Sequence, residues 1–116
     1  MYHKDPSITA KYCFNDLSPE DGTAWVKRMP QHSAFSFGTE LTHAGYKDVP
    51  SSWLFCEGDL CIPAKYQRDG IDRIEKASGK KVDVLRKPWD HIPIVSHAEE
   101  VADWIIAAAE KGGTWE

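Results

Sequence analysis

The sequence predicts a protein of the α/β class, in which helices pack against parallel strands. Residues 51–116 contain a continuous apolar run at 53–56 and a second strand-like stretch at 82–85 (VDVL), and a helical pattern follows each of them. A strand, a crossover helix and a second strand of these lengths form two parallel strands. Residues 1–50 carry helix signals without a convincing strand. We therefore divide the chain into a helical segment, 1–50, and a β-α-β-α unit, 51–116.

The helical segment begins its clearest helix at Ser18. A serine side chain can cap a helix, Pro19 suits the first helical position, and Glu20 and Asp21 favour the positive end of the helix dipole. A second short helix is expected within 32–43. The aromatic side chains on such short helices need to be covered, and either core packing or a ligand pocket beneath a helical cap would cover them.

The first strand and helix of the β-α-β-α unit have clear boundaries. The continuous apolar run 53–56 is typical of a strand buried on both faces, as in parallel sheets. A helix is expected from Pro63, with Tyr66 and Ile71 on its buried side. Gly79 is expected to end this helix.

The second strand is expected at 82–85, and the last helix from Ser96. Ser96 and Glu99 match a capping box, in which each side chain satisfies a free backbone amide of the first turn. Val101 and Trp104 then open an apolar series with helical spacing. Two parallel strands are marginal by themselves, because such sheets need several strands covered on both faces. The pattern therefore indicates one edge of a larger sheet.

Composition excludes several classes of protein. The chain has 116 residues, 41% of them hydrophobic and 28% charged, which is typical of one soluble globular domain. The net charge of −4, with Lys and Arg scattered, argues against a nucleic-acid partner. No apolar stretch approaches the roughly 18 residues of a membrane span, and the first residues lack the apolar core of a signal peptide. We expect no membrane association and a cytoplasmic location.

The cysteines do not predict a disulfide framework or a metal site. Cys13, Cys56 and Cys61 are odd in number. Four residues separate Cys56 from Cys61, and no second cysteine pair completes a zinc site. Cys56 ends an apolar run and is expected to be a buried small hydrophobe. The sequence therefore predicts neither a metal nor another cofactor.

Two residues that could carry chemistry follow the two strands. Catalytic groups in open α/β sheets sit at the carboxyl ends of the strands. Asp59 lies in the turn after the first strand, and His91 lies in the loop after the second. A carboxylate there can accept one imidazole N–H and so leave the other ring nitrogen free as a general base. The pair is predicted to be the acid and the base of a catalytic site.

Each of these residues also has a plainer explanation when taken alone. An aspartate in a turn commonly accepts hydrogen bonds from nearby backbone amides. His91 could equally be a histidine at a strand end with no catalytic role. Glu57 is a second candidate for the acid, Asp90 is expected to support or cap its loop, and His97 is expected to be exposed.

The residues 53–63 (WLFCEGDLCIP), the pair Asp90–His91 and the run 96–101 (SHAEEV) resemble the C-terminal part of the α/β-hydrolase superfamily. The similarity is strongest to an esterase-like branch that includes plant methyl-salicylate esterases, hydroxynitrile lyases and fungal hydrolases. The resemblance implies that Asp59 is the triad acid, that His91 is the triad base, and that 1–50 is the end of a helical cap. It also implies a small-molecule ester substrate.

The serine nucleophile of that superfamily has no counterpart in these 116 residues. It lies on a Gly-x-Ser-x-Gly elbow between a strand and a helix. The nearest match is 34–38 (AFSFG), but the residues before Ser36 are not a buried strand, and Pro30 interrupts them. Ser36 is therefore not expected to be the nucleophile.

Two hypotheses follow for the chain. In the first, it is the C-terminal part of a serine hydrolase and is inactive alone. In the second, it is a truncated, non-catalytic protein that forms a homo- or hetero-oligomer through the exposed sheet edge at 53–56.

Overall fold

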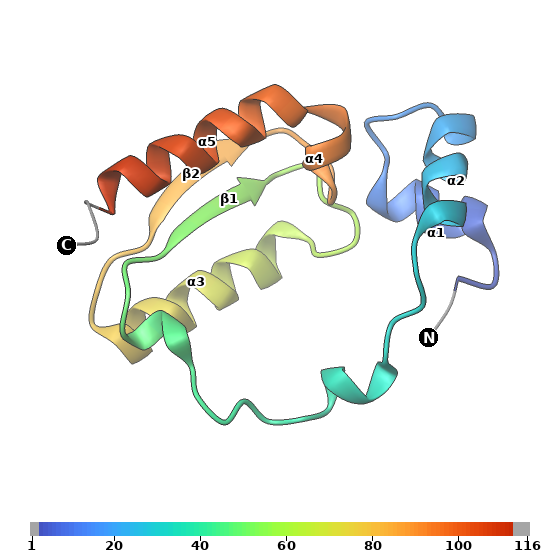
Figure 1. The fold of residues 1–116 in the computed structure, drawn as a ribbon. Coiled ribbons are helices and arrows are strands. Elements are labelled where there is room, and N and C mark those ends of the chain that lie inside the picture. The colour runs from blue at the N-terminus through green and yellow to red at the C-terminus, as the bar shows by residue number, and fades with distance from the viewer. Residues whose placement is uncertain (1–2, 113–116) are drawn as a thin grey trace.

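A computed structural model describes residues 3–112 of the chain (Figure 1). The described residues form helices, two 3₁₀ turns and two strands. They are α1 (Pro6–Cys13), α2 (Pro19–Arg28), η1 (Ala34–Phe37), η2 (Gly45–Lys47), β1 (Ser52–Cys56), α3 (Ala64–Ser78), β2 (Asp83–Lys87), α4 (Pro93–Ser96) and α5 (Ala98–Lys111). No helix within the described range is both long and apolar enough to cross a membrane.

The two strands confirm the predicted parallel pair. β1 and β2 run side by side in a register that pairs Ser52 with Asp83 and Cys56 with Lys87. Helix α3 lies on one side of this pair and α5 on the other (Figure 1). The described residues therefore form a mixed helix-and-strand structure compatible with part of an α/β fold.

Two apolar clusters join the helices to the sheet. On the α3 side, Phe55, Ile71 and Val82 are buried together. On the α5 side, the buried residues are Cys56, Trp89 and Val101. Removal of this apolar surface from water stabilises both layers, and it explains the apolar run in β1.

Helix α3 keeps its predicted boundaries but not its predicted buried side. It follows Pro63 and ends at Gly79, whose φ of 69° is a left-handed conformation that suits glycine. Tyr66 was expected to be buried but is 62% exposed, and Gln67 is buried instead. The reason is that polar backbone groups at the end of β1 need a partner, which the Gln67 amide provides.

Helices α1 and α2 form a separate hairpin with its own core. Ser18 caps α2 as predicted, accepting the Asp21 N–H at 3.1 Å. Helix α1, which was not predicted, begins after Asp5, whose side chain accepts the Ser7 N–H. The buried core between the two helices consists of Ala10, Cys13, Phe14 and Val26.

The expected helix within 32–43 is wrong. Only the 3₁₀ turn η1 forms there, and Phe35 and Phe37 are 82% and 73% exposed. A short helix is stable mainly when an apolar face packs against something. Residues 32–43 are all exposed, so that stabilisation is missing.

The expected capping box at Ser96 is also wrong. The chain makes a separate short helix, α4, that begins with Pro93, and α5 starts after His97. Proline favours a helix start, so the turn closes before Ser96 can act as a cap. The Ser96 hydroxyl is buried without a hydrogen-bond partner within the described part of the chain.

The side of β1 away from β2 has no strand beside it among residues 3–112. The Glu57 N–H donates to the Lys87 carbonyl, and the Asp83 N–H donates to the Ser51 carbonyl. The backbone N–H and C=O groups of odd-numbered residues in this stretch therefore point toward β2. Alternation along a strand then turns the backbone groups of Ser52 and Leu54, like those of Cys56, to the other edge. We call this side the open edge.

Candidate active site

Asp59 lies in the turn after β1 and is buried. Its Oδ1 accepts the backbone N–H groups of Cys61 and Ile62 at 2.8 and 2.7 Å. This is the turn role expected of an aspartate, and it holds the carboxylate in one orientation. The second oxygen, Oδ2, remains available for a partner outside the turn.

That partner is His91, in the loop after β2. The distance between His91 Nδ1 and Asp59 Oδ2 is 2.8 Å, which places a donating N–H on Nδ1. The structure therefore brings the two predicted residues together, while their catalytic role stays a prediction. The His91 side chain is 28% exposed, and no residue in 3–112 hydrogen-bonds its Nε2. The pair can thus accept a proton at Nε2 and stabilise the resulting imidazolium.

Gly58 allows the two loops to approach. A Cβ at this position would lie 2.9 Å from the Trp89 carbonyl oxygen and 3.0 Å from that of Pro88. Any larger residue would push the loops apart. The Asn15 side chain donates to the Gly58 carbonyl at 3.1 Å, so the α1–α2 hairpin also contacts this turn.

Gln67 holds the end of β1 in place. Its Oε1 accepts the Cys56 N–H at 3.0 Å, and its Nε2 donates to the carbonyls of Cys56 and Ile62 at 2.8 and 2.9 Å. Three bonds from one buried amide close the ends of the turn that carries Asp59. Sequence reasoning missed this role, because a glutamine on a helix has no local signature for it.

Two aspartates, Asp16 and Asp90, join the α1–α2 hairpin to the His91 loop by hydrogen bonds. Asp90 accepts the N–H groups of Asp16 and Ile92 at 3.0 and 3.2 Å. In return, its own N–H donates to Asp16 Oδ2 at 2.9 Å. Burial raises the pKa of the Asp90 carboxyl, because the charged form loses its water. Asp90 thus caps its loop as predicted.

The other candidate residues lie elsewhere. Glu57 is exposed and lies 3.7 Å from Arg86, so it does not take the place of Asp59. His97 was expected to be exposed but stacks on Trp89 with ring centres 4.3 Å apart. Its Nε2 lies 3.3 Å from Asp16 Oδ2, which accounts for its partial burial. Ser36 lies on η1 and not on a turn between a strand and a helix. Its hydroxyl donates to the Ser33 carbonyl.

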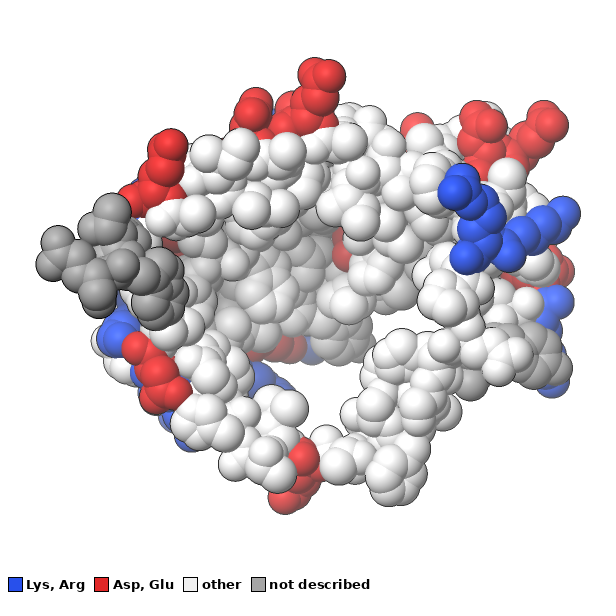
Figure 2. Space-filling model, viewed as in Figure 1, with Lys and Arg blue, Asp and Glu red and all other residues white. Residues whose placement is uncertain are grey.

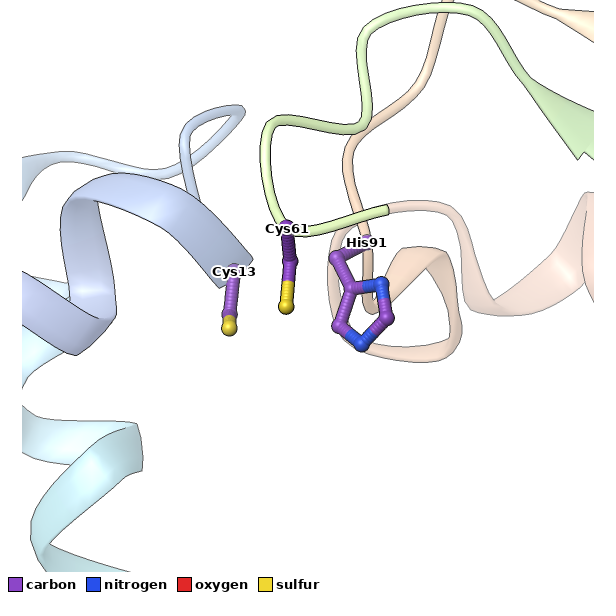
Figure 3. Close-up of side chains that lie close together, drawn as sticks. All are labelled: Cys13, Cys61 and His91. Atoms are coloured by element: carbon purple, nitrogen blue, oxygen red, sulfur yellow. The ribbon is translucent and has the colours of Figure 1, made fainter. Parts of the chain in front are cut away.

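A group of sulfur atoms lies beside His91 (Figure 3). The group consists of Cys13 from α1, Cys61 from the Asp59 turn, and His91. One potential metal-binding atom of each residue lies within 4.8 Å of those of the other two. Burial, and then the neighbouring Cys61, raise the pKa of the Cys13 thiol to about 12. Burial and the Asp59 carboxylate raise that of Cys56 to about 11. No spacing rule could have paired Cys13 with Cys61, because they lie on separate elements.

A shallow hollow of about 340 Å³ lies next to the Asp59–His91 pair. Most of its lining is apolar, and it includes Trp53, Leu54 and Trp104 from β1 and α5. In Figure 2 acidic side chains lie over α5, and both acidic and basic side chains lie toward α1 and α2. A largely apolar hollow beside a potential base suits a small, mostly apolar molecule.

Fold and site together describe an α/β protein with a carboxylate–histidine pair at the carboxyl ends of two parallel strands. The chain is 35% identical over 107 residues to the "Probable hydrolase R7" of Phoma sp. (strain ATCC 20986 / MF5453), which covers 92% of this chain and 44% of that protein. It is 27% identical over 96 residues to the "Alpha/beta hydrolase nvfD" of Aspergillus novofumigatus (strain IBT 16806), covering 83% and 37%.

These similarities support a family relationship with the α/β-hydrolases. The chain spans less than half the length of either of these curated relatives. No family model matches the sequence, and no solved structure matches it.

Proposed function

We propose that the chain supplies the acid and the general base of a serine-type α/β-hydrolase of the esterase-like branch, corresponding to its C-terminal part. The observation that carries this proposal is the 2.8 Å bond between His91 Nδ1 and Asp59 Oδ2 at the ends of neighbouring parallel strands. Its substrates would be small esters or related acyl compounds, in keeping with the largely apolar hollow beside the pair.

The proposed chemistry uses the free ring nitrogen. His91 Nε2 takes the proton of a serine hydroxyl as that oxygen attacks the ester carbonyl, and then gives the proton to the departing alcohol. Asp59 keeps the ring oriented and stabilises the imidazolium that forms between these steps. Positioned proton transfer of this kind contributes roughly 10²- to 10⁴-fold to the rate.

The serine and the oxyanion hole would come from a segment other than these 116 residues, since the sequence contains no Gly-x-Ser-x-Gly elbow. The open edge of β1 offers a place for that segment. A parallel strand could pair with the free backbone groups of Ser52 and Leu54, while Trp53 and Leu54 lie next to the hollow. The alternative is a non-catalytic protein that binds a partner chain through the same edge. Its pairing with that chain would bring no hydrolysis.

The test is complementation. The chain is mixed with the part of the R7 relative that lies outside its matched 107 residues, and hydrolysis of p-nitrophenyl acetate and labelling by a fluorophosphonate are measured. We expect no activity from the chain alone and both activity and labelling from the mixture. In the mixture, His91→Ala and Asp59→Asn should lower the rate by about 10²- to 10⁴-fold.

The matched control is His43→Ala, which removes an exposed histidine that is also bonded to an aspartate, Asp48. It should leave the rate unchanged. Full activity of the His91→Ala mixture would refute the proposal. So would labelling of the chain alone that Ser36→Ala removes, because the nucleophile would then be Ser36. Association without any hydrolysis or labelling would favour the non-catalytic alternative.

Nucleotide sequence provides a second test that does not depend on assembly. We expect the codons on the 5′ side of Met1 to encode a strand, a Gly-x-Ser-x-Gly elbow and a helix. An intergenic region there would count against a hydrolase made as one polypeptide.

A further inference from the structure

Three potential metal ligands converge from three separate elements. Cys13 ends α1, Cys61 lies in the turn after β1, and His91 lies in the loop after β2. Their ligand atoms lie within 4.8 Å of one another. In Figure 3 the three side chains lie next to one another and extend to the same side of the backbone. The three side chains thus bring two sulfur atoms and one imidazole to one place.

We propose that Cys13, Cys61 and His91 bind one divalent cation of the zinc class. Thiolate sulfur and imidazole nitrogen are the donors that zinc prefers, and a tetrahedral zinc ion holds such atoms about 3.3 to 3.8 Å apart. Closing the cluster from 4.8 Å to that size requires movements of about 1 Å shared among the three side chains. The proposal does not rest on the hydrolase function, and a cation on His91 Nε2 would block the proton transfer proposed there for as long as it is bound.

Asp59 prepares the histidine for this role. Metal-binding histidines almost always donate their other N–H to a carboxylate or carbonyl, which sets the tautomer and the ring orientation. His91 Nδ1 makes that bond to Asp59 Oδ2 at 2.8 Å, so Nε2 is the nitrogen that a cation would meet. Asp59 is itself held by the Cys61 and Ile62 amides, so the carboxylate, the histidine and one thiol form a connected unit.

Charge and access also suit a dication. A bound cation displaces the proton of a coordinating thiol, so Cys13 and Cys61 would bind as thiolates. Two thiolates then balance the charge of the ion. Cys61 is exposed, so a cation can enter from solvent. With three protein ligands, the fourth tetrahedral position would hold water.

The experiment is a metal titration of the whole chain with its thiols kept reduced. Zn²⁺ affinity is measured by competition with a chromophoric chelator, and Co²⁺ is added separately as a spectroscopic probe. We expect one ion per chain, a thiolate-to-cobalt charge-transfer band in the near ultraviolet, and no comparable binding of Mg²⁺.

Three variants assign the ligands. Cys61→Ala changes an exposed side chain and should weaken Zn²⁺ binding by at least about tenfold while weakening the charge-transfer band. Asp59→Asn keeps an Oδ1 acceptor for the turn and should weaken binding by about 10- to 100-fold, with the band retained. Cys56→Ala removes the cysteine outside the cluster and should leave affinity and band unchanged. Circular dichroism verifies that each variant is folded.

Two results would overturn the proposal. One is that the wild-type chain binds no Zn²⁺, or that the folded Cys61→Ala variant binds it as tightly as the wild type does. The other is a Cys13–Cys61 disulfide that forms in air while the reduced chain binds no Zn²⁺, which would assign the two thiols to a redox pair.

Discussion

Replacing Gly58 by alanine tests whether close approach of the two loops builds the site. The added Cβ would lie 2.9 and 3.0 Å from two backbone carbonyl oxygens, which cannot rotate away. Restoring ordinary contact requires the loops to separate by about 0.5 Å, and overpacking of this kind costs about 1–3 kcal/mol. The same movement would lengthen the 2.8 Å His91–Asp59 bond to about 3.3 Å, beyond the usual range of a charge-assisted bond.

Urea unfolding measures this cost. The matched control is Gly45→Ala, because a Cβ at Gly45 meets nothing within 4 Å. We expect Gly58→Ala to lower the free energy of unfolding by about 1–3 kcal/mol and Gly45→Ala to leave it nearly unchanged. The further loss caused by Asp59→Asn should be smaller in the Gly58→Ala background, where its bond to His91 is already stretched. Equal effects of the two glycine substitutions, or full additivity with Asp59→Asn, would refute the reasoning.

Three other predictions concern single side chains. Gln67→Ala should cost about 1–3 kcal/mol in urea unfolding, because it leaves the buried N–H of Cys56 without a partner and leaves its C=O with the Asp59 N–H alone; a loss below that of a typical surface substitution would contradict this. The hydrogen bond from the Lys81 ammonium lowers the pKa of Glu75 in the folded chain. The ionised Glu75 therefore stabilises the fold above its unfolded pKa, and this stabilisation is lost as pH falls through its folded pKa. Glu75→Gln should therefore be less stable than the wild type at neutral pH, and the difference should disappear as the pH falls through the lowered pKa of Glu75; a difference that persists when Glu75 is protonated would contradict it. Iodoacetamide followed by mass spectrometry should modify the exposed Cys61 well before the buried Cys56, whose thiol pKa is raised to about 11.

Local patterns predicted the β-α-β-α unit well. The apolar run of β1 and the left-handed stop at Gly79 are short-range signals, and the structure follows both. Because parallel strands place their carboxyl ends at one edge, the meeting of Asp59 with His91 also followed from element order alone. Helix α1 could have been found too, since Asp5–Pro6 repeats the cap-and-proline signal of Ser18–Pro19.

Contacts between distant segments could not be predicted in this way. The reciprocal bonds of Asp16 with Asp90 join residues 74 positions apart, and nothing in either neighbourhood indicates the other. The meeting of Cys13 with Cys61 depends on that same attachment of the hairpin to the loop. The capping box failed for a related reason, since two overlapping start signals, at Pro93 and at Ser96, competed and the earlier one formed the turn.

Gln67 has a consequence for how the chain behaves in concentrated solution. A bare strand edge is a template on which other chains can add strands and aggregate. At the Cys56 end of the open edge, the Gln67 amide already occupies the backbone N–H and C=O that an incoming strand would need. An added strand is therefore confined to the stretch around Ser52 and Leu54. The same amide that shapes the Asp59 turn thus also sets how far along β1 a second strand can extend.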